Sequence, residues 1–272
     1  MHALFYLLSD SALPMLEFAT DPPVLAALLV VAFLAGFIDA IAGGGGLLTL
    51  PALLTAGLPP HLVLGTNKLS ATFGSATASF TFYRRKLFEP RQWRFALVAT
   101  AIGAALGAGL AHLIPARWLN LLLPLVVFAC GLYLLFGRVP VTPRATAAPI
   151  DKRRQWPQGL ILGFYDGVAG PGTGAFWTVS NMLLHSLDLL KASGVARSMN
   201  FVSNGIALSV FVINGQVAWA LGIGMGLALM VGAYLGARTA IQGGSRFIRP
   251  IFILVVLALS LRLAWQHWFG AT

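Results

Sequence analysis

Long apolar stretches constrain the fold of this chain more than any other feature. They recur in the 272 residues at 24–42, 93–113, 119–136, 217–237 and 247–265. Each is about as long as a helix must be to cross a ~30 Å hydrocarbon core. Only 10% of the residues are charged, whereas soluble domains carry about a quarter. The sequence therefore predicts an all-α polytopic membrane protein, because a transmembrane barrel would alternate polar and apolar residues in short segments.

The positive charge of the chain follows the same organisation. The formal net charge is +10, and nearly all Lys and Arg lie in the short gaps between the apolar stretches. This placement is typical of the residues that orient a membrane protein, and not of a nucleic-acid interface. We therefore expect a lipid bilayer as the partner of these charges, and no nucleic acid.

The chain also contains an internal repeat. "GFIDAIAGGGG" (36–46) aligns with "GFYDGVAGPGT" (163–173). After a short insertion in the second half, "GTNK" (65–68) aligns with "GVAR" (194–197), and "GAALGA" with "GAYLGA" further on. These matches predict two homologous halves. The expected organisation is an N-terminal segment over 1–23, a first transmembrane repeat over 24–136, a basic linker over 137–156 and a second transmembrane repeat over 157–268.

Each half is expected to hold three short or interrupted segments followed by two full spans, which gives about 8–10 membrane segments. In the first half the segments are expected at 24–42, 46–57, 67–83, 93–113 and 119–136. In the second half they are expected at 158–170, 174–187, 198–214, 217–237 and 247–266.

The loop charges indicate how the two halves are oriented. The loop "RRKLFEPRQWR" (84–94) of the first half is strongly basic, whereas its counterpart "INGQVAW" (213–219) carries no charge. The loop before the fifth segment reverses this difference, because it is the second half that holds more arginines there. The positive-inside rule is then satisfied only if each half crosses an odd number of times. We therefore predict an inverted repeat with a cytoplasmic linker and with both chain ends extracytoplasmic.

Inverted repeats with broken helices are characteristic of secondary transporters, whose substrate sites lie at the breaks. Here the breaks are "GGGG" and "PGTG". A helix that begins just after them, at about Leu47 or Ala175, would direct free N–H groups and its positive dipole end toward an anion. Tight helix crossing is the alternative use of glycine, which we favour for "GAALGA" and "GAYLGA". The predicted anion-binding backbone comprises Gly43, Gly44, Gly45, Gly46, Gly170, Gly172, Thr173 and Gly174.

Two cations occupy equivalent repeat positions, Lys68 and Arg197, near the starts of the third segments. A charge at the centre of a membrane helix costs roughly 2.5–3.5 kcal/mol, so such residues are candidates for function. Together they would bind an oxyanion, with the guanidinium group offering a bidentate fork. The alternative is that both side chains extend to the membrane interface. Polar liners are expected among the side chains on or near these segments, although each could equally form a hydrogen bond between helices. They are Asn67, Ser70, Thr72, Ser75, Asn200, Ser203 and Asn204.

Asp39 and Asp166 are the only carboxylates within the apolar segments, and the repeat places them at matched positions. They are candidates for proton coupling. The alternative is that each braces its glycine loop by accepting hydrogen bonds from backbone N–H groups. The histidines lack metal-ligand spacing, and neither a nucleophile–base set nor a P-loop motif is present. We therefore expect neither enzymatic activity nor a metal or other cofactor.

The stretch "GFIDAIAGGGGLLTLPALLTAGLPPHLVLGTNKL" (36–69) resembles the signature of the TauE/SafE sulfite exporter family, also called the toluenesulfonate uptake permeases. The second half, from "GFYDGVAGPGTGAF" through "ARSMNFVSN", is similar to that family's second repeat. The resemblance implies a bacterial plasma-membrane transporter of small sulfur-containing anions such as sulfite, sulfoacetate or sulfonates. We expect a secondary transporter coupled to the proton gradient. The sequence is compatible with either a monomer or a homo-oligomer. A passive anion channel, or a transporter of another small organic anion, is the alternative.

Overall fold

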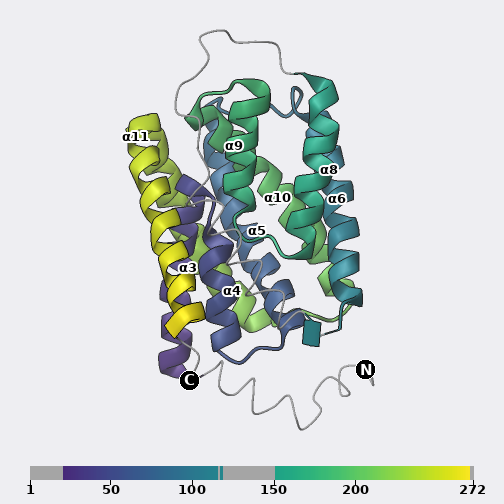
Figure 1. Cartoon of the computed structure of the whole chain (residues 1–272), viewed down its shortest axis with the longest axis vertical. Helices are drawn as coiled ribbons and strands as arrows, with labels where there is room; N and C mark the ends of the chain where they lie inside the picture. The colour runs from purple at the N-terminus through teal and green to yellow at the C-terminus, as the bar shows by residue number, and fades with distance from the viewer. Residues whose placement is uncertain (1–20, 116, 119–150, 270–272) are drawn as a thin grey trace.

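The computed structural model of the chain describes residues 21–115, 117–118 and 151–269 (Figure 1). Over these residues it is helical and contains no strand, so the predicted all-α class is confirmed. The first half contributes α3 (Pro22–Ala42), α4 (Gly45–Thr55), α5 (Pro60–Arg84) and α6 (Arg94–Leu113). The second contributes α8 (Lys152–Val168), α9 (Thr173–His185), α10 (Leu189–Ile213) and α11 (Trp219–Phe269).

Gly244 has non-helical dihedral angles and divides α11 into two arms. In the described part of the chain, α3, α6, α10 and the first arm of α11 are long and apolar enough to cross a membrane. The segment expected at 119–136 lies outside the described residues.

The two glycine breaks turn α3–α4 and α8–α9 into helical hairpins. Leu25, near the start of α3, packs against the apolar cluster that holds Leu53, near the end of α4. In the second hairpin Gln158 of α8 donates a hydrogen bond to Asn181 of α9 over 2.8 Å. The short helices α4 and α9 therefore return toward the end from which the preceding helix came. Figure 1 shows the two hairpins opening at opposite ends of the molecule.

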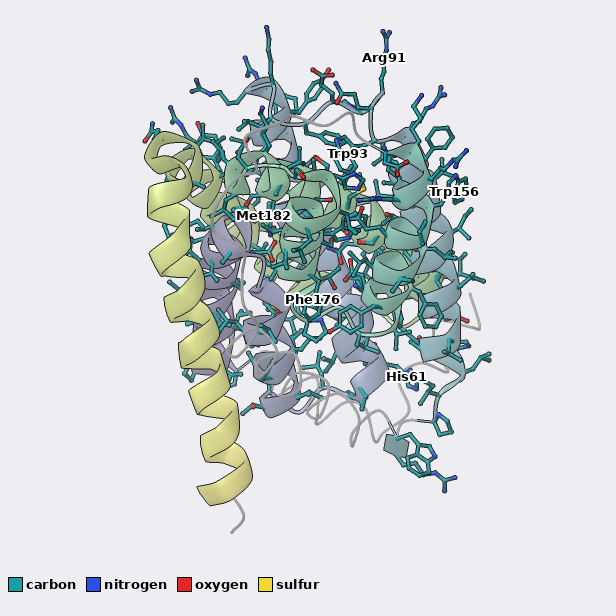
Figure 2. The ribbon with its side chains drawn as sticks, turned by 45° about the horizontal axis from the view of Figure 1, so that its top comes forward. His61, Arg91, Trp93, Trp156, Phe176 and Met182 are labelled. Carbon is teal, nitrogen blue, oxygen red and sulfur yellow. The ribbon has the colours of Figure 1, made fainter. Side chains whose placement is uncertain are left out.

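The helices connect two distinct ends. The basic end comprises residues 84–94, 151–158 and 184–190, which are joined by contacts such as the 2.8 Å hydrogen bond from Gln155 Nε2 to Gln92 O. At the opposite end, Gln216 lies 2.9 Å from His112 Nδ1. Figure 2 places Arg91 and Trp156 at the first of these ends and His61 toward the other. The helices matched by the repeat therefore run in opposite directions: α5 ends where α10 begins, and α6 and the first arm of α11 are likewise antiparallel.

The packing between the halves is reciprocal. α6 lies against α8, where a Cβ atom added to Gly103 would stand 2.4 Å from Leu160 O. α11 lies against α3, where a Cβ atom added to Gly232 would stand 2.0 Å from Phe33 O. The alignment of the two halves matches Gly103 with Gly232 and Phe33 with Leu160, so the two contacts are equivalent. The motifs "GAALGA" and "GAYLGA" therefore serve close helix packing, as favoured from the sequence.

Three helices begin more than one helical turn earlier than the sequence suggested. α5 begins at Pro60 and α10 at Leu189, whereas the segments were expected from 67 and 198. Pro60 suits the first position of a helix, where a missing N–H costs nothing. Asp188 caps α10 by accepting a hydrogen bond from Lys191 N over 2.9 Å. α8 starts at Lys152, inside the expected linker. The stretches "GTN" and "SGVA" are therefore helical, and the predicted position of the two cations near helix starts is wrong.

Candidate functional site

The glycine breaks of the two halves meet each other inside the molecule. Ala175 N donates to Gly43 O over 3.2 Å, which joins the start of α9 to the end of α3. A Cβ atom on Gly43 would stand 2.4 Å from Ala175 N, and one on Gly174 would stand 2.8 Å from Gly43 Cα. Gly43 also has φ of 87°, a left-handed conformation that L side chains rarely adopt. Glycine is thus required here both for the turn and for the approach of the two backbones.

A small cavity of about 30 Å³ lies at this junction. Both halves line it, and so do all the residues predicted as site residues except Gly44, Arg197 and the hydroxyl-bearing polar liners (Ser70, Thr72, Ser75 and Ser203). The lining residues are Asp39, Gly43, Gly45, Gly46, Thr49, Asn67, Lys68, Ala71, Asp166, Gly170, Gly172, Thr173, Gly174, Asn200, Asn204 and Leu229. The expected cation Arg197 lies directly behind this lining, since its Nη1 is 2.7 Å from where a Cβ atom of Gly174 would stand.

Two ion pairs cross between the halves at the cavity. Lys68 Nζ of the first half lies 2.8 Å from Asp166 Oδ1 of the second, and these side chains are 1% and 4% exposed. Arg197 Nη1 of the second half lies 3.5 Å from Asp39 Oδ2 of the first, with exposures of 0% and 20%. The repeat relates one pair to the other. The alternative interpretation, in which both cations extend to the membrane interface, is wrong because both are buried in helix interiors and paired.

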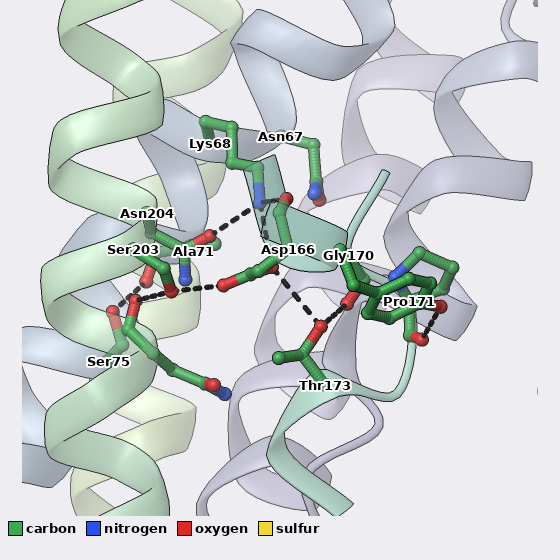
Figure 3. A network of polar contacts seen from close by, with 12 residues as sticks. Asn67, Lys68, Ala71, Ser75, Asp166, Gly170, Pro171, Thr173, Ser203 and Asn204 are labelled. Carbon is green, nitrogen blue, oxygen red and sulfur yellow. Dashed lines mark hydrogen bonds and ion pairs between the residues drawn. The ribbon is translucent and has the colours of Figure 1, made fainter. Parts of the chain in front are cut away.

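The Lys68–Asp166 pair has a complete set of hydrogen-bond partners (Figure 3). Lys68 Nζ also donates to the backbone oxygen of Asp166 and, over 3.1 Å, to Asn204 Oδ1. Asp166 Oδ2 accepts from the hydroxyl of Ser203, and Oδ1 accepts from Thr173 Oγ1 over 3.3 Å. A buried ion pair tolerates its desolvation only when the remaining donors and acceptors are satisfied in this way. The geometry makes this pair a fixed link between α5, α8 and α10.

The Arg197–Asp39 pair is looser and more open to water. Asp39 Oδ1 accepts from Gly45 N over 3.0 Å, so this carboxylate braces its glycine loop, as the alternative interpretation held. Its other oxygen has only the 3.5 Å contact with Arg197 among the described residues. Arg197 otherwise donates to backbone oxygens, namely those of Asp39, Gly174 and Ser193. Gly174 belongs to the second glycine break and Asp39 lies one turn before the first, so the guanidinium group links the backbone at the two breaks.

Asn200 carries an unused hydrogen-bonding atom at the cavity. Its side chain lines the cavity and is 5% exposed, yet its Oδ1 has no partner among the described residues. A buried polar atom without a partner is uncommon and calls for an explanation such as a ligand or water. An amide offers either its oxygen or its NH2 group by rotating its plane. The repeat places Ala71 at the matching position, so this unpaired amide oxygen is present in one half alone.

The helices after the breaks begin slightly earlier than expected, α4 at Gly45 and α9 at Thr173. The first residues of both helices line the cavity, so two helix N-termini adjoin it. Their dipoles favour negative charge there.

The sequence-based set omitted Thr49, whose Oγ1 donates to Asn67 Oδ1 over 2.6 Å. Ser203, which was among the expected polar liners, binds Asp166. The signal for Thr49 was its position one helical turn after Gly45.

The fold and the cavity define a polytopic α-helical membrane protein in which two broken helical hairpins meet at a buried, charge-paired cavity. The family model described as "Sulfite exporter TauE/SafE" matches residues 28–263. The chain therefore belongs to the TauE/SafE sulfite exporter family, as the sequence resemblance indicated, and the names of its relatives mark it as a membrane transporter.

Three relatives cover nearly the whole chain. The "Probable membrane transporter protein ORF9" of Sinorhizobium sp is 41% identical over 250 residues, which are 88% of this chain and 92% of the relative. A "Probable membrane transporter protein" of Haemophilus influenzae is 39% identical over 252 residues, 90% of this chain and 97% of the relative. The "Probable membrane transporter protein YfcA" of Escherichia coli K12 is 37% identical over 265 residues, 93% and 97% of the two chains. No solved structure matches the chain.

Proposed function

We propose that this protein is a secondary transporter of a small sulfur-containing anion, such as sulfite, sulfoacetate or another sulfonate, coupled to the proton gradient across a bacterial plasma membrane. The observation that carries the proposal is the crossed arrangement of two buried cations, each held by a carboxylate of the other half. The printed family name, which refers to sulfite export, supports the substrate class.

The size and charge of the cavity link anion binding to a proton. The cavity of about 30 Å³ matches the volume of roughly one water molecule, so an oxyanion of several heavy atoms does not fit while both pairs are closed. With both carboxylates ionised, two cations and two anions leave the site without net charge. Protonation of one carboxylate gives the site a net positive charge and releases a cation. An anion and a proton would therefore bind together.

Asp39 and Arg197 form the pair that opens in this mechanism. Their contact is longer than the 2.8 Å contact of the other pair, and Asp39 is 20% exposed whereas Asp166 is 4% exposed. The proton is taken up by Asp39, and the released guanidinium group binds the oxyanion through its fork of N–H donors. Asn200 supplies a further contact, and the N-termini of α4 and α9 stabilise the negative charge. Lys68 and Asp166 stay paired and hold the two halves in register.

The opposed hairpins offer a route for alternating access. We propose that the two halves form an inverted repeat in the membrane, with the basic end in the cytoplasm and both chain ends outside. The α3–α4 hairpin then opens toward the outside and the α8–α9 hairpin toward the cytoplasm (Figure 1). Displacement of one hairpin or the other would expose the same cavity to one side at a time.

Uptake of radiolabelled sulfite and sulfonates into proteoliposomes, with and without a pH gradient, tests this function. We expect the gradient to drive accumulation and the Arg197→Gln variant to lose it. Arg154→Gln is the matched control, because Arg154 is exposed and pairs with Asp151 at the basic end. Transport that is equal with and without the gradient would identify a passive anion channel. Undiminished transport by the Lys68→Ala/Arg197→Ala double variant would exclude the proposed anion site.

A further inference from the structure

A groove of about 900 Å³ lies between α5 and the first arm of α11, away from the central cavity and at the basic end. Three arginines line it: Arg84 at the end of α5, Arg85 at the C-cap of that helix, and Arg238 from α11. The groove has no acidic residue in its lining, and none of these arginines forms an ion pair with a described residue. It therefore combines concave shape with positive charge that the described residues leave unneutralised.

Aromatic side chains hold two of the arginines over the groove. The guanidinium carbon of Arg84 lies 5.8 Å from the ring centre of Phe80, one turn earlier on α5. That of Arg238 lies 5.3 Å from the ring of Tyr234, one turn earlier on α11, and its Nη1 donates to Tyr234 OH over 3.0 Å. Such cation–π contacts orient the charged groups and leave donors free. The two facing helices thus present the same arrangement toward one space.

The groove holds its arginines toward the basic end, and its aromatic side chains lie one helical turn further into the membrane. Phe80 and Tyr234 are 60% and 43% exposed, and Ala76 continues the lining one turn before Phe80 on α5. Tyr234 and Arg238 both lie in the membrane-spanning arm of α11, toward its end at Gly244. The arginines are therefore placed where a lipid head group lies, and the apolar side chains where an acyl chain lies.

The corresponding surface of the other half carries no such charge. The alignment that pairs Lys68 with Arg197 also sets Ile213 and Asn214 against the two arginines of α5, and Gly109 against Arg238. Helix packing alone would require similar residues in both halves. Orientation in the membrane does not explain the three groove arginines either. The positive-inside rule requires only basic residues at the cytoplasmic end, and other arginines of the loop 84–94, outside the groove, already meet this requirement.

We propose that this groove binds an anionic phospholipid of the cytoplasmic leaflet, with the lipid phosphate on the three arginines and one acyl chain along Phe80 and Ala76. Basic pockets between transmembrane helices on the cytoplasmic side are suited to anionic head groups. The proposal does not depend on the transported substrate, because the groove and the central cavity share no lining residue.

Native mass spectrometry of the full chain, released from detergent that contains phosphatidylglycerol or phosphatidylcholine, tests this site. The groove variant Arg84→Gln/Arg85→Gln/Arg238→Gln is compared with Arg91→Gln/Arg94→Gln/Arg153→Gln, which removes the same charge from the same end. At about 5-fold per arginine, the groove variant should bind phosphatidylglycerol about 100-fold more weakly than wild type. The control variant should stay close to wild type.

A single substitution keeps the proposal testable if the triple variant fails to fold. Arg238→Gln should weaken binding of phosphatidylglycerol about 5-fold. Its matched control is Arg94→Gln, because Arg94 also stacks on a neighbouring ring, that of Phe95 at 4.8 Å. Equal losses in the groove and control variants would overturn the proposal. Equal binding of the two lipids by the wild-type protein would also overturn it. If the wild-type protein retained neither lipid, the proposal would be overturned as well, and a different occupant of the groove would be indicated.

Discussion

Substitution of Lys68 by Met removes the cation from a buried ion pair and leaves its carboxylate behind. At 2.8 Å and an effective dielectric constant of ~20, the Coulomb attraction between Lys68 and Asp166 is about 6 kcal/mol. Desolvation of each ion costs several kcal/mol, so the pair as a whole contributes little net stability. The variant, however, leaves Asp166 4% exposed and without its cation. Breaking a buried pair in this way costs about 3–5 kcal/mol, and the remaining donors Ser203 and Thr173 favour the lower end of this range.

A second substitution separates this effect from a loss of packing. In Lys68→Met/Asp166→Asn the buried carboxylate is replaced by a neutral amide, so the double variant should recover about 2 kcal/mol relative to Lys68→Met, because replacing both members of a buried pair is often close to neutral. Reversible unfolding in SDS, followed by circular dichroism, measures the free energy of unfolding of each variant. Lys191→Met is the control, because Lys191 is exposed and lies 3.8 Å from Asp188. The reasoning fails if the double variant is less stable than Lys68→Met, since the two losses would then add.

Two further predictions concern the packing and the orientation of the helices. Gly107→Ala should destabilise the protein by about 1–3 kcal/mol, because its Cβ atom would stand 2.1 Å from Phe164 O. Gly109→Ala on the same helix is the control: its Cβ atom meets nothing within 4 Å, so this variant should be neutral or stabilising. Thermal unfolding measures both variants, and equal effects on stability would contradict the helix packing described above. In a background without the native Cys130, N214C should react with a membrane-impermeant thiol reagent added to intact cells, whereas K86C should react only after the inner membrane is opened. The opposite labelling pattern would reverse the proposed orientation.

The architecture was accessible from the sequence because membrane insertion leaves few alternatives. Long apolar stretches can only be helices, and glycine runs beside matched carboxylates mark the places where helices break. The repeat alignment that pairs Asp39 with Asp166 also identified the two positions that the folded chain brings to one cavity. The apolar stretches and the glycine runs are local signals, because their physical cause acts within a few residues.

The pairing at the cavity was not accessible in the same way. Lys68 was expected near a helix start and free to attract an anion, whereas it lies in the interior of α5 and binds Asp166, 98 residues away. Which carboxylate neutralises which cation depends on how α8 and α10 pack against α5, and this packing follows from small-residue contacts between described helices of both halves. The sequence therefore indicated which charged residues belong to the site. Their crossed pairing, on which the proposed coupling depends, could be deduced only from the folded structure.

The number of protons taken up with each bound anion tests the central proposal most directly. Isothermal titration calorimetry of the binding of a simple alkylsulfonate, whose own acid group stays ionised throughout, measures this number for the purified protein when it is repeated in buffers of different ionisation enthalpy. At a pH where Asp39 is ionised before binding, we predict about one proton per anion for wild type, with binding about tenfold weaker for each pH unit upward. Asp188→Asn, a matched change at an exposed helix cap, should behave like wild type. Asp39→Asn should bind without taking up a proton, because its neutral amide already leaves Arg197 free. Binding by the wild-type protein without proton uptake, or an unchanged proton count in Asp39→Asn, would contradict the exchange of a carboxylate for the transported anion.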